Sequence, residues 1–157
     1  MSLALEELGA KQADLFLLSW PANIDTEAGE LLWKEMERSV DEGKALSLGI
    51  SDIETNPFIQ LHEKARIKPE AIQINLESCC VVPPELALFA RENNTQLLTH
   101  NDPRNILSDE EFQTICSAST MITVNWTVRY QTLLRCRGII QNKGYIISAQ
   151  QMLDLDH

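Results

Sequence analysis

Short apolar runs alternate with segments of helical periodicity along this chain, and that alternation constrains its fold more than any other feature. The first run, at 14–21, is continuous and ends at Pro21, which is typical of a strand buried on both faces. Three further runs predict strands: 45–50, 71–76 and 95–100. Apolar residues at helical spacing predict the segments between them as helices: 27–42, 55–66 and 83–93. The pattern favours a parallel α/β sheet, either an open doubly wound sheet or part of a barrel.

Local boundary residues support these assignments. Gly43 is expected to end the helix at 27–42, and the pair Pro83-Pro84 to open the helix at 83–93. Ser108 with Glu111 has the spacing of a capping box. Beyond it we expect a helix at 122–134 and one or two short strands within 138–148, while 1–12 looks like the tail of an amphipathic helix.

Length and charge bound the classes of function. At 157 residues and 17.8 kDa the chain suits a single domain over 1–157. Its formal net charge of −10 makes nucleic acid a poor partner. No apolar run approaches the length of a membrane span, and the first residues lack the basic region of a signal peptide. A cytoplasmic location is the expectation.

Common catalytic and metal motifs are absent from the sequence. There is no phosphate-binding glycine loop and no C-x-x-C pair, and after His62-Glu63 the position of a second metal-binding histidine is Arg66. We expect no metal site, and we expect His62 to be solvated. His100 is of more interest because it ends a strand, and in β/α barrels the strand ends carry the active site.

The sequence resembles the aldo-keto reductase family in several motifs. The run DLFLLSWP at 14–21 is similar to that family's DLYLIHWP, and LLWKEMERSVDEGKALSLGISD and EKARIKPEAIQIN are similar to two further motifs. The resemblance implies a partial (β/α)8 TIM barrel that lacks about its first three β/α units, since a full barrel needs about 250 residues. Two unpaired sheet edges would then make the isolated chain marginally stable.

Departures from the family pattern bear on catalysis. Reductases of this kind use a tyrosine acid tuned by lysine and aspartate on earlier strands, with a histidine where this chain has Ser19. We therefore expect no catalytic residues. Ser51, Asp52 and Gln73 match positions that hold the nicotinamide carboxamide, although the family prefers asparagine where Asp52 stands. We interpret these three as a vestigial cofactor site with no resident cofactor, and any NADPH binding there as weak.

One subgroup is similar over nearly the whole chain. The segments QINLESCCVVPP, QLLTHNDP and RGIIQNKGY resemble the modifier subunits of glutamate–cysteine ligase, which are catalytically silent relatives of the reductases. The resemblance implies a regulatory partner of the ligase catalytic subunit that raises its glutamate affinity and weakens feedback inhibition by glutathione. Two alternatives stay open: an NADPH-dependent aldo-keto reductase or a fragment of one, and a truncated product that does not fold.

Three of the four cysteines are candidates for partner contact or redox chemistry. Cys79 and Cys80 follow the third predicted strand, and Cys136 is a weaker candidate. The alternatives are that they act as small buried hydrophobic residues, that they cross-link to the catalytic subunit, or that Cys79 and Cys80 form a vicinal disulfide.

Overall fold

The computed structural model describes residues 1–76, 81–103, 106–116, 122–134 and 138–151. They form two compact units, residues 1–102 and residues 103–157. The elements of the first unit are α1 (Ser2–Glu7), β1 (Ala13–Ser19), α2 (Thr26–Asp41), β2 (Ala45–Ser51), α3 (Thr55–Lys64), β3 (Ala71–Asn75), α4 (Pro84–Glu92) and β4 (Gln96–His100). Those of the second are α5 (Asp109–Ile115), β5 (Ile122–Leu134) and β6 (Ile139–Gln151). The sequence analysis expected a single domain over 1–157, and this stays a prediction.

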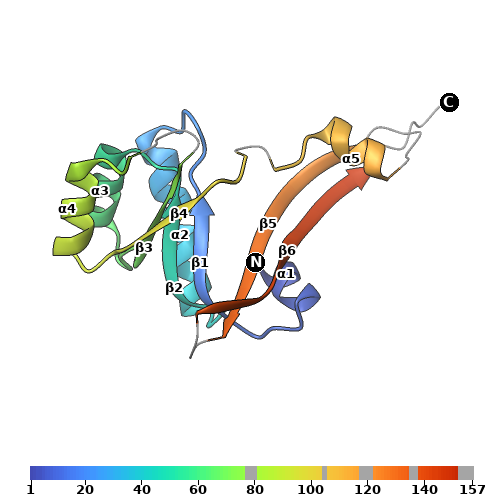
Figure 1. The fold of residues 1–157 in the computed structure, drawn as a ribbon, viewed down its shortest axis with the longest axis horizontal. Helices are drawn as coiled ribbons and strands as arrows, with labels where there is room; N and C mark the ends of the chain where they lie inside the picture. Colours follow the sequence, from blue (N-terminus) through green and yellow to red (C-terminus); the bar gives the residue numbers. More distant parts are fainter. Residues whose placement is uncertain (77–80, 104–105, 117–121, 135–137, 152–157) are drawn as a thin grey trace. The chain divides into compact units, whose positions relative to one another are not determined.

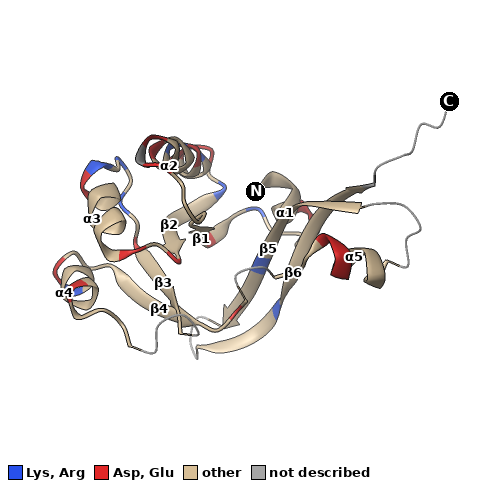
Figure 2. Ribbon diagram, turned by 90° about the horizontal axis from the view of Figure 1, so that it is seen from above, with Lys and Arg blue, Asp and Glu red and all other residues tan. Residues whose placement is uncertain are grey.

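The first unit is a parallel α/β sheet whose strand order, β1-β2-β3-β4, follows the sequence (Figure 1). Each neighbouring pair is parallel, with Ser19 opposite Ser51, Ser51 opposite Gln73, and Asn75 opposite His100. Helices α2, α3 and α4 lie along the same side of the four strands (Figure 2). The predicted alternation of strands and helices is therefore confirmed for this unit, whereas closure into a barrel stays a prediction.

The core of this unit lies between the sheet and its helices. Its largest fully buried side chains include Trp33, Phe58, Leu48, Ile50, Ile72 and Leu86. Full burial of each of the phenylalanine, leucine and isoleucine side chains among them stabilises the fold by about 1.5–3 kcal/mol. The Trp33 indole donates from Nε1 to the carbonyl of Ile67 at 3.0 Å, so this large residue is buried without an unsatisfied donor.

The expected boundary residues act as predicted. Gly43 has φ of +70° just after α2, and an added Cβ there would meet nothing within 4 Å, so the turn needs glycine for its backbone conformation alone. Helix α4 begins at Pro84. Ser108 and Glu111 form a full capping box at the start of α5.

The second unit corrects one sequence prediction. Residues 122–134 form strand β5 and not a helix, and β5 pairs antiparallel with β6 as a long ribbon (Figure 1). The segment is rich in β-branched and aromatic residues, which pack well on a pleated surface and lose rotamer freedom in a helix. One or two short strands were expected within 138–148, and the structure has one long strand there, β6.

No helix in the described part of the chain is long and apolar enough to cross a membrane.

His62 is not fully solvated, contrary to the sequence prediction. Its ring packs edge-on to Phe89, with 5.2 Å between the ring centroids, and its centroid lies 6.1 Å from that of Phe58. Burial lowers the pKa of His62 below its ordinary value, with the nearby charge of Lys68 adding to the effect.

Candidate functional site

The carboxyl ends of β2, β3 and β4 bring six polar residues together, because the strands are parallel and in register. We call this set the strand-end cluster: Ser51, Asp52, Gln73, Asn75, His100 and Asp102. It includes the three predicted cofactor positions and the histidine that the sequence singled out. The structure brings these positions together, whereas a role in cofactor binding stays a prediction.

His100 lies between two carboxylates. Its Nε2 is 2.9 Å from Asp52 Oδ1, and its Nδ1 is 3.3 Å from Asp102 Oδ2. Only 7% of the His100 side chain is exposed, against 11% for Asp52 and 24% for Asp102. The backbone N–H of Asp102 donates to Nδ1 at 3.3 Å, so in the neutral ring Nε2 carries the proton and donates to Asp52. Both ring nitrogens are thus engaged within the cluster.

Asp52 is held by contacts on both its backbone and its side chain. Its backbone has φ of +62°, a left-handed conformation that aspartate and asparagine adopt more readily than other non-glycine residues. Its N–H donates to the Gln73 carbonyl at 3.0 Å, and its Oδ2 accepts from Ser51 Oγ at 2.8 Å.

Asn75 is a member of the cluster that the sequence analysis missed. Its Nδ2 donates to the Asp102 carbonyl at 2.8 Å, and the N–H of Leu76 donates to the His100 carbonyl at 2.9 Å. These bonds fix the segment after β4 that carries Asp102. The position of Asn75, the last residue of an apolar strand, could have pointed to it.

The cluster does not have the order of a nucleophilic triad. In a triad the histidine bridges the carboxylate and the hydroxyl, so that it can take the hydroxyl proton. Here Asp52 is the bridge, since Ser51 donates to Asp52 and His100 contacts the other oxygen of the same carboxylate. His100 is therefore not placed to activate Ser51.

Other predicted positions lie elsewhere. Ser19 ends β1 opposite Ser51 and is exposed. The two tyrosines of the chain, Tyr130 and Tyr145, both belong to the second unit. Among the residues that the structure describes, no group of three or more His, Cys, Asp or Glu side chains could hold a metal ion.

The cysteine predictions fall outside the described residues. Cys79, Cys80 and Cys136 all lie in ranges that the structure leaves undescribed. Cys116, just after α5, is exposed and free. The alternatives for Cys79, Cys80 and Cys136 stay open.

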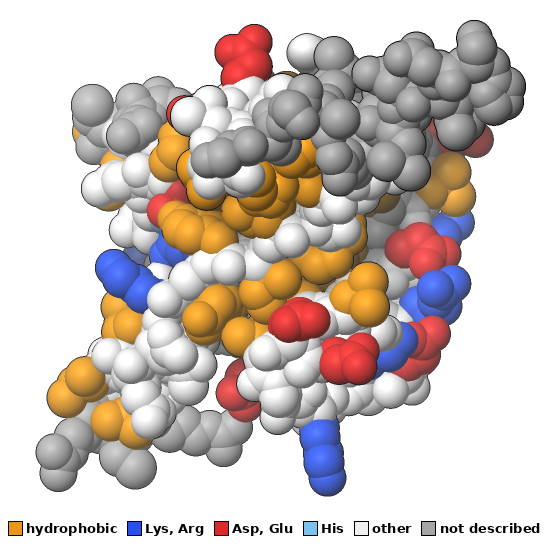
Figure 3. All heavy atoms as spheres, turned by 90° about the vertical axis from the view of Figure 1, so that its right-hand side faces the viewer, with side chains coloured by type: hydrophobic (Ala, Val, Ile, Leu, Met, Phe, Trp, Pro, Cys, Tyr) orange, Lys and Arg blue, Asp and Glu red, His pale blue; other side chains and the backbone are white. Residues whose placement is uncertain are grey.

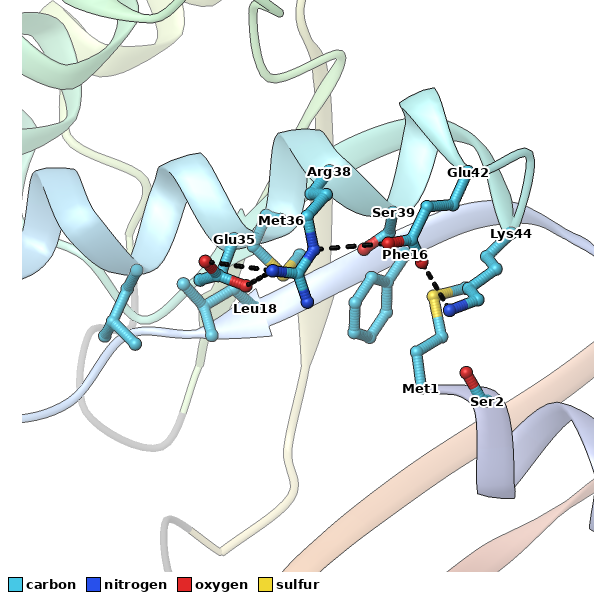
Figure 4. A pocket seen from close by; sticks show the side chains of 11 residues that line it. Met1, Ser2, Phe16, Leu18, Glu35, Met36, Arg38, Ser39, Glu42 and Lys44 are labelled. Carbon is cyan, nitrogen blue, oxygen red and sulfur yellow. Dashed lines mark hydrogen bonds and ion pairs between the residues drawn. The ribbon is translucent and has the colours of Figure 1, made fainter.

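A cavity of about 310 Å³ lies apart from the cluster, among residues of α1, β1 and α2 (Figure 4). Its apolar lining includes Met1, Phe16, Leu18, Leu32 and Met36. On its rim Arg38 pairs with Glu35 at 3.0 Å and with Glu42 at 3.2 Å, and Lys44 also pairs with Glu42. Because these charges pair with one another, the rim offers little attraction for an ionic ligand.

Comparisons with known proteins agree with the fold. The profile of the Aldo/keto reductase family matches residues 3–102. The glutamate–cysteine ligase regulatory subunit of Homo sapiens is 36% identical over 162 residues, covering 96% of this chain and 59% of that protein. An aldo/keto reductase structure from Brucella melitensis superposes with a TM-score of 0.54 at 22% identity, covering 74% of this chain and 44% of that chain. The chain thus spans little more than half the length of the human protein.

Proposed function

Because the chain belongs to the aldo/keto reductase family, we propose that it keeps the fold of that family without its chemistry and acts as a non-catalytic regulatory subunit. The proposed partner is the catalytic subunit of glutamate–cysteine ligase, in a heterodimer. The proposed effects are a higher affinity of that subunit for glutamate and weaker feedback inhibition by glutathione. The identity of 36% over 96% of the chain with the human regulatory subunit supports this partner.

One observation of the structure carries the non-catalytic part of the proposal. Both nitrogens of His100 are occupied by neighbours within the strand-end cluster, and the chain has no tyrosine in the unit that holds the cluster. A carbonyl reductase needs a proton donor at the reacting oxygen. A histidine between two carboxylates is held as a structural link and is poorly placed to serve as that donor.

The binding experiment uses the full chain and the purified catalytic subunit. We expect the two to elute together in size-exclusion chromatography at equimolar amounts, with a heat of binding in isothermal titration calorimetry. Bovine serum albumin in place of the chain is the control. Separate elution with no heat of binding would contradict the proposal.

The cofactor interpretation is a separate part of the proposal. We propose that Ser51, Asp52 and Gln73 bind NADPH weakly, because the Asp52 carboxylate is already engaged by Ser51 and His100. When NADPH is titrated with the chain, its fluorescence should be quenched little at micromolar concentrations of the chain. Steady oxidation of NADPH in the presence of an aldehyde would instead identify a reductase, the alternative that family membership favours.

The cysteines give the proposal a redox aspect. We propose that Cys79, Cys80 or Cys136 contacts the catalytic subunit and cross-links to it under oxidising conditions. Non-reducing gels of the complex with the wild-type chain should show a band at the summed mass, which Cys79→Ser, Cys80→Ser or Cys136→Ser removes. A band pattern unchanged by all three substitutions would exclude a cross-link through these cysteines, but not a non-covalent contact between the subunits.

The architecture and location of the chain complete the proposal. We propose that the sheet β1-β2-β3-β4 is an arc of a (β/α)8 barrel, in which parallel strands follow one another in sequence order, as they do here. We propose further that residues 1–157 behave as a single domain and act in the cytoplasm. A single melting transition, seen equally by far-UV and near-UV circular dichroism, would support one cooperative domain.

A further inference from the structure

The ribbon of β5 and β6 is aliphatic where β5 ends and β6 begins. The last two residues of β5 are Leu133 and Leu134, and the first two of β6 are Ile139 and Ile140. They pair across the ribbon, Leu133 with Ile140 and Leu134 with Ile139. Between 42% and 54% of each residue is exposed. We call these four residues the ribbon tip.

The ribbon tip is apolar on both faces of the ribbon. Successive residues of a strand point to opposite faces, so Leu133 and Ile140 lie on one face and Leu134 and Ile139 on the other. The described residues next to them, 131–132 and 141–143, are exposed as well, whereas most of β5 before them is half-buried. A flat surface packed against the ribbon would therefore cover one aliphatic pair and leave the other in water.

Other hydrophobic side chains also reach the surface, as Figure 3 shows for one side of the molecule. In the first unit the exposed residues Leu3, Leu31, Leu46 and Leu88 are spread over four different elements. Scattered exposed leucines are normal in folded proteins, whereas contiguous apolar surface indicates a site of interaction. The four residues of the ribbon tip are contiguous, because they form two adjacent cross-strand pairs.

The charge of the sequence around the ribbon tip is positive. Residues 131–143 contain three of the 13 basic residues, Arg135, Arg137 and Lys143, and none of the 23 acidic residues. Arg135 and Arg137 lie outside the described residues, and Lys143 is exposed. This segment of an otherwise acidic chain is therefore suited to an anionic surface.

The acidic first turn of α5 is held at the other end of the ribbon. The backbone N–H of Val124 donates to Asp109 Oδ1 at 2.8 Å, which fixes the start of α5 beside the start of β5. Leu134 follows Val124 by ten residues, a distance of about 34 Å along the strand. The Debye length at physiological ionic strength is about 8 Å, so the negative charge of α5 is screened at the ribbon tip.

We propose that the ribbon tip inserts into the surface of an anionic lipid bilayer. When the ribbon enters the interface end-on, the aliphatic pairs of both faces are buried together. The basic residues beside them attract the anionic headgroups that the cytoplasmic leaflet carries. Apolar and electrostatic contacts of this number give reversible binding at the surface. The inference goes beyond the proposed function and shares with it only the cytoplasmic location.

The test is co-sedimentation of the full chain with lipid vesicles. The wild type is expected to bind vesicles of phosphatidylcholine and phosphatidylserine about tenfold or more tightly than vesicles of phosphatidylcholine alone, and less tightly at high salt. Lys143→Glu should weaken binding to the anionic vesicles by about threefold or more and change binding to the neutral ones little.

Two double variants test the faces separately, and a third is their control. Leu133→Gln/Ile140→Gln and Leu134→Gln/Ile139→Gln should each weaken binding to anionic vesicles about tenfold, because both faces insert. Leu31→Gln/Leu46→Gln removes two leucines of the first unit that are 57% and 55% exposed, and it should bind like the wild type. Far-UV circular dichroism checks that each variant is folded.

A folded wild-type chain that does not bind anionic vesicles would overturn the inference. Equal loss of binding in the control and the tip variants would do the same, and so would self-association, measured by gel filtration, as the only property that the tip variants change. Binding of the catalytic subunit is measured without vesicles. A chain that binds the subunit but no vesicle leaves the proposed function standing, and one that binds vesicles but not the subunit leaves the inference standing.

Discussion

At the residue scale, the left-handed Asp52 links the strand-end cluster together. Its backbone reaches β3 through Gln73, and its carboxylate joins Ser51 to His100. Such a conformation costs free energy in most residues and persists only where the surroundings fix it. The sequence analysis singled out Asp52 and His100 separately, but the bond between these residues, 48 positions apart, depends on strand register, which the pattern alone does not supply.

Substitutions of Asp52 test whether its hydrogen bond or its charge matters. Asp52→Ala leaves the buried Nε2 of His100 without an acceptor and places alanine at φ of +62°, so we expect the free energy of unfolding to fall by about 2–3 kcal/mol. Asp52→Asn keeps an acceptor oxygen and tolerates this φ, so its cost should be below about 1 kcal/mol. Urea unfolding measures both. Equal costs would show that the charge matters more than the hydrogen bond.

His62 makes stability depend on pH in a defined direction. Its folded-state pKa is lowered, first by burial and then by Lys68, while Glu63 acts in the opposite sense. The unfolded chain, in which this pKa is about 6.5, therefore binds more protons in the window below that value. Stability should be fully present above about pH 6.5 and decrease as the pH falls through the folded-state pKa.

The variant His62→Gln isolates this effect, because the other titrating groups are unchanged. Thermal melts at pH 7.5 and pH 5.5 should show a smaller decrease in Tm for His62→Gln than for the wild type. Parallel pH dependence in the two proteins would contradict the assignment.

At the element scale, the tight contact of β2 with its neighbours depends on Gly49. A Cβ at this position would lie 2.4 Å from Leu17 Cδ2 and 2.8 Å from the carbonyl oxygen of Ala71. The leucine can shift, but the backbone of β3 cannot move without breaking its pairing with β2. Gly49 is thus required by the close approach of three strands, since its φ is not in the left-handed range.

We expect Gly49→Ala to lower the free energy of unfolding by about 1–3 kcal/mol through overpacking. Leu46→Ala is the control on the same strand, because 55% of Leu46 is exposed, and it should cost about 0.5 kcal/mol or less. Guanidinium unfolding of both variants measures the difference. A neutral or stabilising effect of Gly49→Ala would show that the strands can separate at low cost.

The elements also show how far the sequence could predict the fold. The four strands of the sheet were predictable because each is a short apolar run bounded by turn residues, and Gly43, Pro84 and Ser108 act at the boundaries as expected. Strand β5 was not predictable in this way, because its apolar residues also satisfy helical spacing and its partner β6 follows only later in the chain. Pairing with β6 decides the structure of such a segment.

At the scale of the whole molecule, the sheet has two edges in the described part of the chain. Strand β1 pairs only with β2, and β4 pairs only with β3. Unpaired edges offer rows of free backbone groups to other chains and add nothing to the stability of the sheet. The sequence could predict these edges from the number of strands.

We therefore expect marginal stability for the isolated chain. A far-UV circular dichroism melt should show a transition below about 65 °C, within or under the ordinary range of mesophilic domains. Addition of the catalytic subunit should raise the melting temperature, because a partner that binds only the folded chain stabilises it. A sharp transition above that temperature for the chain alone would mean that the unpaired edges lower its stability only slightly.

The most direct test of a regulatory role is the glutamate KM of the catalytic subunit, measured while this chain is added in increasing amounts. The account predicts that KM decreases about fivefold or more and reaches a plateau at one chain per catalytic subunit, as a coupling between two binding events requires. A glutamate KM that stays constant up to a large excess of folded chain would contradict it.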